Sequence, residues 1–121
     1  MDLSNAEVAE AFSRHEFAKA YDRLDPDVRW DVVGDKVFEG SAAVRAQCAE
    51  SARWLASATT TFRRFDLLVG PDFVVADTTA EYAADDGDPT VVGSCDVYRF
   101  RGDRLVAIRS YTVEVTTPSP A

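Results

Sequence analysis

The sequence has few of the residues that bind metals or form disulfides. It contains one histidine, His15, and two cysteines, Cys48 and Cys95, which lie in dissimilar contexts and without C-x-x-C spacing. Structural zinc sites take about four cysteine or histidine ligands, so no metal site is expected. The same scarcity excludes a disulfide framework, and reduced thiols in a cytoplasmic protein are the expectation.

Positive charge is also scarce. Lysine and arginine number 13 against 21 acidic residues, which gives a formal net charge of -8. Nucleic acids and anionic membrane surfaces attract basic proteins, so neither is expected as a partner.

No apolar run reaches the length of a membrane span, and residues 1–7 lack the basic and apolar regions of a signal peptide. No glycine-rich phosphate loop is present, so no nucleotide, flavin or other cofactor is expected.

What is present is a chain of 121 residues, 46% of them hydrophobic, which is enough for a core. A single domain over residues 1–121 is predicted, with a frayed tail at 117–121. The first half favours helices and short strands. The pattern predicts a helix over Asn5–Leu24, broken near its middle and ended by Asp25-Pro26-Asp27, strands at Val28–Val33 and Lys36–Glu39, and a helix from about Ala42 to Ala56 with Ser41 as N-cap.

The second half is typical of long strands separated by turns. Four strands are predicted, at Thr59–Val69, Phe73–Ala83, Thr90–Arg101 and Arg104–Thr116, with glycine-, proline- and aspartate-rich turns between them. Helices followed by a run of antiparallel strands indicate an α+β fold with a mostly antiparallel sheet. Long strands in a small domain curl, so the concave face and the helices can enclose a pocket.

Asp96 is the charged residue whose position most needs an explanation. In the strand that contains it, Asp96, Tyr98 and Phe100 share one face, whereas Arg99 and Arg101 share the other. The arginines mark the solvent side, so Asp96 lies on the apolar side. An ionised carboxylate there is costly unless it is paired, hydrogen-bonded, protonated or exposed to a cavity.

The strand before Asp96 leaves room for such a cavity. Its predicted inner face carries small or moderate side chains, Val74, Ala76, Thr78 and Ala80, which fill space poorly. The alternative is a core filled by large aromatic residues, for which Trp30, Trp54 and Tyr98 are the candidates.

Two stretches of sequence resemble a known family. Asp31-Val32-Val33-Gly34-Asp35-Lys36-Val37-Phe38-Glu39-Gly40-Ser41-Ala42-Ala43-Val44-Arg45 resembles the ketosteroid isomerase segment that runs from its general-base aspartate into the third helix. Val91-Val92-Gly93-Ser94-Cys95-Asp96-Val97-Tyr98-Arg99-Phe100-Arg101-Gly102 resembles the strand that holds the isomerase's protonated oxyanion aspartate. With the order of elements, these stretches resemble the nuclear transport factor 2-like (NTF2-like) superfamily, in its SnoaL-like and ketosteroid-isomerase-like branch.

The resemblance implies a cone-shaped, curved sheet closed by three helices, a hydrophobic pocket and a homodimer formed through the outer sheet face. It implies Asp31 as a base that moves a proton from carbon, and Asp96 as a neutral hydrogen-bond donor, the pKa separation known from ketosteroid isomerase. Phe12 stands where the isomerases have their oxyanion tyrosine, and Tyr98 or Tyr21 could replace that donor. The other predicted pocket residues are Gln47, Trp54, Thr78, Ile108 and Ser110.

Two functions of different classes remain open. The first is a cofactor-independent isomerase or cyclase that acts on a small, largely apolar molecule such as a polyketide- or steroid-like ring system. The second is a non-catalytic binding module of the same fold, which Phe12 favours because a phenyl ring cannot donate a hydrogen bond. An epoxide hydrolase with an Asp-Arg-Asp set is disfavoured, because the strand period points Arg109 outward.

Overall fold

The first helix of the chain begins at a capping box and ends at a left-handed residue. The computed structural model describes residues 2–84 and 87–116. Helix α1 (Asn5–Ser13) starts where the Ser4 side chain accepts from the Glu7 amide and the Glu7 carboxylate accepts from the Ser4 amide. His15 has a φ of 68°, which stops α1, and a 3-10 helix, η1 (Phe17–Arg23), follows. The predicted break in the first helical region is confirmed.

The first strand differs from its predicted bounds. Strand β1 (Leu24–Val32) begins before Val28 and includes Pro26, because its register against its neighbour is irregular between Leu24 and Arg29. Proline is tolerated at such irregularities, where no ladder amide is needed. Strand β2 (Lys36–Glu39) then pairs back antiparallel to β1, as predicted.

Helix α2 (Ser41–Ala56) begins one residue earlier than the sequence indicates. Its N-cap is Gly40, with no side-chain cap, so the assignment of Ser41 as N-cap is wrong. Gly40 has a φ of 89°, which a side chain would disfavour, and its amide donates to the Val28 carbonyl at 2.7 Å. This glycine therefore turns the chain from β2 into the helix.

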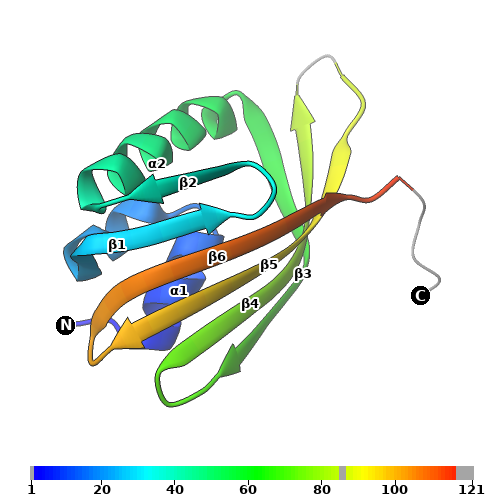
Figure 1. Ribbon diagram of the computed structural model, residues 1–121. Coiled ribbons are helices and arrows are strands. Elements are labelled where there is room, and N and C mark those ends of the chain that lie inside the picture. The colour runs from blue at the N-terminus through cyan, green and yellow to red at the C-terminus, as the bar shows by residue number, and fades with distance from the viewer. Residues whose placement is uncertain (1, 85–86, 117–121) are drawn as a thin grey trace.

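The remaining strands are long and close to their predicted bounds. They are β3 (Ala58–Val69), β4 (Phe73–Ala84), β5 (Thr90–Arg101) and β6 (Arg104–Glu114). The sheet order is β2-β1-β6-β5-β4-β3, and among the described residues the β1–β6 pairing alone is parallel (Figure 1). The predicted turn residues Asp85 and Asp86 and the predicted tail at 117–121 lie outside the described residues.

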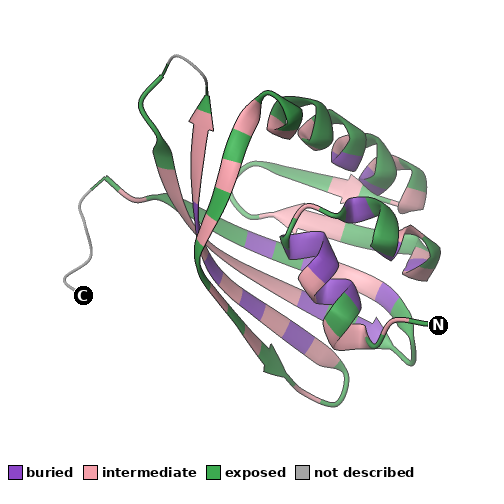
Figure 2. Cartoon of the chain, turned by 180° about the vertical axis from the view of Figure 1, so that it is seen from behind, coloured by how far each residue is buried: buried purple, intermediate pink, exposed green. Residues whose placement is uncertain are grey.

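The helices cover one face of the curved sheet. Figure 2 shows α1 lying across this face, where buried residues recur along the strands. The predicted inner face of β4 is confirmed, since Val74, Ala76, Thr78 and Ala80 are all buried. Around them the core combines α1, α2 and the strands, with Phe12, Val28, Val44, Tyr98, Leu105 and Ile108 among its buried members. The architecture confirms the predicted α+β fold, with three helical segments in the first half and an open, curved, mostly antiparallel sheet. None of the helices in the described part of the chain is long and apolar enough to cross a membrane.

Candidate functional site

A cavity of about 410 Å³ lies between the helices and the inner face of the sheet. Apolar atoms make up most of its lining surface, and the carboxyl of Asp96 is exposed to it. The lining residues come from α1, η1 and the turn between them, from α2, and from the four strands β1, β4, β5 and β6. They are Phe12, Ser13, His15, Phe17, Trp30, Val32, Gln47, Glu50, Ser51, Trp54, Leu55, Tyr82, Val92, Ser94, Asp96, Ser110 and Thr112.

Asp96 lies on the inner face of β5, as the strand period predicts. The Ser13 hydroxyl donates to Asp96 Oδ2 at 3.0 Å, and Ser110 is directly opposite Asp96 in the β5–β6 ladder. Burial raises the pKa of Asp96 above its ordinary value, and the hydroxyls of Ser110 and Ser13 lower it in part. The result is a carboxyl that holds its proton to higher pH than a solvated aspartate.

Each of the two serines is itself held by an aromatic side chain. Trp30 Nε1 donates to Ser110 Oγ at 3.0 Å, and the Tyr98 hydroxyl lies 2.5 Å from Ser13 Oγ. Burial raises the pKa of Tyr98 well above its ordinary value, so its hydroxyl stays protonated and can donate to Ser13. Ser13 and Ser110 therefore orient Asp96, and each serine is itself oriented by an aromatic residue, Tyr98 or Trp30.

His15 and Tyr82 form a second polar pair at the cavity wall. His15 Nε2 lies 2.9 Å from the Tyr82 hydroxyl, and the imidazole packs beside the rings of Phe17 and Phe62. Burial lowers the pKa of His15, which favours the neutral imidazole. Burial, and to a lesser extent the charge of Asp96, raises the pKa of Tyr82. The cavity thus holds an acid and a base whose pKa values are displaced in opposite directions from their usual ones.

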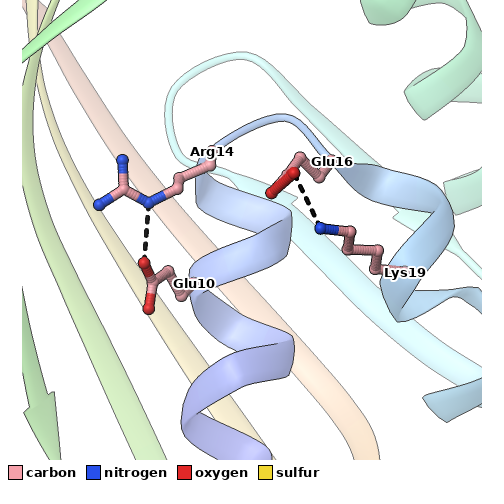
Figure 3. A network of polar contacts seen from close by, with 4 residues as sticks. All are labelled: Glu10, Arg14, Glu16 and Lys19. Carbon is pink, nitrogen blue, oxygen red and sulfur yellow. Dashed lines mark hydrogen bonds and ion pairs between the residues drawn. The ribbon is translucent and has the colours of Figure 1, made fainter. Parts of the chain in front are cut away.

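Ion pairs fix the chain on both sides of His15. Arg14 Nε lies 2.8 Å from Glu10 Oε2, and Lys19 Nζ lies 2.9 Å from Glu16 Oε1. Figure 3 shows both pairs. The Arg14 guanidinium also lies 3.9 Å from the centroid of the Phe65 ring on β3. The Arg14–Phe65 contact ties the turn that contains His15 to the sheet.

The structure does not place Asp31 in the cavity with Asp96, so the expectation that the two share one site is wrong. Along β1, Trp30 and Val32 line the cavity, and the two-residue period therefore turns Asp31 to the outer face. There it lines a different hollow with Arg29, Arg99 and Arg109. Arg109 points outward, as the sequence predicts.

The other predicted pocket residues divide into two groups. Phe12, Gln47, Trp54 and Ser110 line the cavity. Three others are buried in the core and do not line the cavity: Thr78, Tyr98 and Ile108. Tyr98 nevertheless contacts a cavity residue, because its hydroxyl is hydrogen-bonded to Ser13. Tyr21 does not line it either, because its ring packs under the Arg45 guanidinium at 4.9 Å.

Several residues of the site were not singled out from the sequence. Tyr82 continues the inner face of β4 from Ala80, so the strand period could have placed it. Ser13 follows Phe12 on α1 and carries no signal of its own. His15 faces the cavity because of its positive φ, which no local pattern predicts. In residues 2–84 and 87–116, no three histidine, cysteine or acidic side chains gather as a metal site would require.

The fold has many relatives among solved structures. An NTF2-like protein of unknown function from Cytophaga hutchinsonii is 25% identical with a TM-score of 0.78, over 88% of this chain and 93% of that chain. A proposed SnoaL-like polyketide cyclase from a Jannaschia species is 15% identical, with a TM-score of 0.72 over 93% of this chain and 90% of that chain. An LEH-like epoxide hydrolase from Mycobacterium tuberculosis is 16% identical, with a TM-score of 0.64 over 90% and 82%. These likenesses define an α+β cone of the NTF2-like class.

The sequence narrows this class further. The family model described as a SnoaL-like domain matches residues 6–108, which include α1, α2, most of the sheet and Asp96. A search of curated proteins gives no match. The chain belongs to the SnoaL-like domain family.

Proposed function

We propose that this protein binds a small, largely apolar organic molecule in the cavity and moves a proton on it without a cofactor. The observation that carries the proposal is Asp96, a carboxyl of raised pKa on a wall of mostly apolar surface, oriented by Ser13 and Ser110. Perturbed titratable groups in a concave site are typical of acid–base catalysts. A volume of about 410 Å³ suits a ligand of one or a few rings.

The step that fits these groups is the isomerisation of a carbonyl compound. Protonated Asp96 donates its proton to the carbonyl oxygen, while neutral His15 takes a proton from the adjacent carbon, which leaves an enol. If the substrate is a β,γ-unsaturated carbonyl compound, this enol is a dienol, and His15 can return its proton to the γ-carbon while the enol oxygen returns its proton to Asp96. The double bond has then moved into conjugation with the carbonyl, and both groups are restored. His15 replaces Asp31 in this scheme, since Asp31 lies on the other face of the sheet. The Jannaschia relative, a proposed polyketide cyclase, has the same fold.

A non-catalytic binding module is the second candidate. Phe12 favours it, because this ring lines the cavity and cannot donate a hydrogen bond, whereas the sequence resemblance to the isomerases implies a donating tyrosine at this position. Epoxide hydrolysis is not proposed, even though the fold is shared with such an enzyme, because Arg109 is on the outer face.

The binding part of the proposal is tested by fluorescence. Trp30 and Trp54 are the two tryptophans of the chain, and both line the cavity. Titration with bicyclic ketones such as 2-tetralone should therefore change tryptophan emission and saturate. Ser94→Phe fills the cavity from β5 and should weaken this binding about tenfold or more, since interiors leave little room for added volume.

Cys95→Phe is the matched control for this experiment. Cys95 is the next residue of β5 and faces the outer side, so the same ring added there should leave ketone binding unchanged within about twofold. Equal affinity in both variants would contradict binding in this cavity.

A homodimer through the outer face of the sheet, in a cytoplasmic protein, is also proposed. Leu68 on β3 and Val113 on β6 point to that face and are 61% and 66% exposed. Exposed apolar side chains on a sheet are typical of an interface. We expect sedimentation to give the mass of two chains and Val113→Asp to reduce it to one. A single-chain mass for the unmodified protein at micromolar concentration would contradict the dimer.

A further inference from the structure

A second hollow, of about 390 Å³, lies on the outer face of β1, β6 and β5, away from the cavity of Asp96. Three arginines line it, Arg29, Arg99 and Arg109, with Asp31 as the one acidic residue. The remaining lining residues are Val97, Ala107, Ile108 and Tyr111. The charged lining residues are thus mostly basic, whereas the chain as a whole has a net charge of -8.

The sheet register explains why these side chains converge. Ala107 on β6 pairs with Arg29 on β1 and with Arg99 on β5, so the two arginines flank a methyl group. Neighbouring strands are about 4.8 Å apart, which puts the two arginine backbones about 10 Å apart across this floor. In the next row Arg109 lies between Asp31 and Val97. A small residue between long ones produces the depression.

Two of these guanidinium groups lack an ionic partner. The Arg29 guanidinium donates to Glu39 at 3.2 Å, but in the described ranges neither the Arg99 nor the Arg109 side chain forms an ion pair or a hydrogen bond. The other arginines of the described chain all bond a carboxylate or a backbone carbonyl. Asp31 is next to Arg109 in the ladder, yet no ion pair joins them. Arg109 instead lies 5.6 Å from the centroid of the Tyr111 ring, which holds its side chain at the edge of the hollow.

We propose that this outer hollow binds a small dianion, an organic phosphate or a dicarboxylate. Guanidinium groups match phosphate and carboxylate oxygens with paired N–H donors, and the two partnerless groups can each take one anionic end. Val97 and the ring of Tyr111 supply an apolar wall for the carbon part of the ligand. The ligand of this site is distinct in charge from the apolar molecule proposed for the inner cavity.

The test is calorimetric titration of the whole chain at low ionic strength with two probes, inorganic phosphate and succinate. Arg99→Gln and Arg109→Gln should each weaken binding about tenfold, the effect of one charge-assisted hydrogen-bonding group at an exposed site. Arg63→Gln is the control: it removes the same charge from β3, where Arg63 pairs with Glu81, and should change affinity by less than about twofold. Asp31→Asn should strengthen binding about two- to fivefold, because it removes the repelling carboxylate.

The outcomes distinguish an organic phosphate from a dicarboxylate, and they also show whether the proposed site exists. Binding of phosphate alone assigns an organic phosphate, and binding of succinate alone assigns a dicarboxylate. In the single chain Arg63, Arg99 and Arg109 are exposed and Asp31 is partly exposed. Unchanged circular dichroism verifies that each variant is folded. The proposal is overturned if neither probe binds the unmodified chain, or if Arg63→Gln weakens binding as much as Arg99→Gln does.

Discussion

Asp96→Asn is expected to lower the rate of ligand proton exchange about 10²–10³-fold, the usual cost of losing one acid or oxyanion donor. The reaction can be followed without knowledge of the true substrate: 2-tetralone is incubated with the protein in D₂O, and deuterium uptake at carbon is measured by NMR. The asparagine amide keeps the size of the side chain but has no acidic proton to transfer. The fall should appear in the catalysed rate while saturation of the tryptophan signal by the ketone is retained.

Asp31→Asn is the matched control for this experiment. It makes the same chemical change on the outer face of the sheet, so the exchange rate should stay within about twofold of that of the unmodified protein. A large loss in Asp31→Asn with none in Asp96→Asn would restore the pairing that the sequence suggests. If the unmodified protein binds ketones without accelerating exchange at all, the non-catalytic binding module is the correct function.

Asp96→Asn should also change how the stability of the protein depends on pH. The pKa of Asp96 is raised in the folded state, so the folded protein binds this proton more tightly than the unfolded chain does. This contribution is fully present below the unfolded pKa of about 3.9 and is lost as the pH rises through the folded pKa. Urea unfolding should therefore show Asp96→Asn gaining stability relative to the unmodified protein as the pH rises through this window. A constant difference across it would contradict the raised pKa.

Phe12→Ala should cost about 3–5 kcal/mol of unfolding free energy. Phe12 is 3% exposed and meets three rings edge-on, those of Phe17, Trp30 and Tyr98, at centroid distances of 5.1, 5.2 and 5.9 Å. Alanine removes these contacts and leaves an enlarged void, because the surrounding backbone cannot close over it. Such a loss is a large share of the roughly 5–15 kcal/mol that stabilises a typical domain.

Urea denaturation followed by circular dichroism measures this change. Val69→Ala is the control, since Val69 is largely exposed at the end of β3 and its truncation should cost less than about 0.5 kcal/mol. A loss below about 1 kcal/mol in Phe12→Ala would show that the ring is replaceable. Phe12 would then be a wall of the cavity and not a support of the fold.

The fold could be predicted because its signals are local. Turn residues and the two-residue period give the four long strands to within a few residues, and the broken helix follows from its apolar stripe. The predicted boundaries of helices are wrong where the conformation of a single residue decides where the helix begins. Gly40 starts α2 through its positive φ, which the sequence cannot distinguish from capping by the adjacent Ser41.

The site was predicted less well, and the two aspartates show why. Asp96 was placed correctly because Arg99 and Arg101 mark the solvent face of its own strand. On β1 the apolar residues Val28, Trp30 and Val32 carry the same kind of signal and indicate that Asp31 points outward. The family resemblance predicts the opposite orientation for Asp31, toward the pocket, and this prediction is wrong. The contacts of Ser13, His15 and Trp30 join residues far apart in the chain, and no local pattern reveals them.

The parallel pairing of β1 with β6 also decides when the site can exist. Trp30 reaches Ser110 across a separation of 80 residues, and Ser13 reaches Asp96 across 83. Contacts between distant segments close large loops and form slowly, so β1 and its hairpin partner must wait for the last strand before they have a place in the sheet. During synthesis the helices and the β3–β5 meander emerge first, with Asp96 on an uncovered surface. A chain that ends before β6 lacks Ser110. It also lacks the strand against which β1, and with it Trp30, is placed in the sheet, so it can have no such cavity.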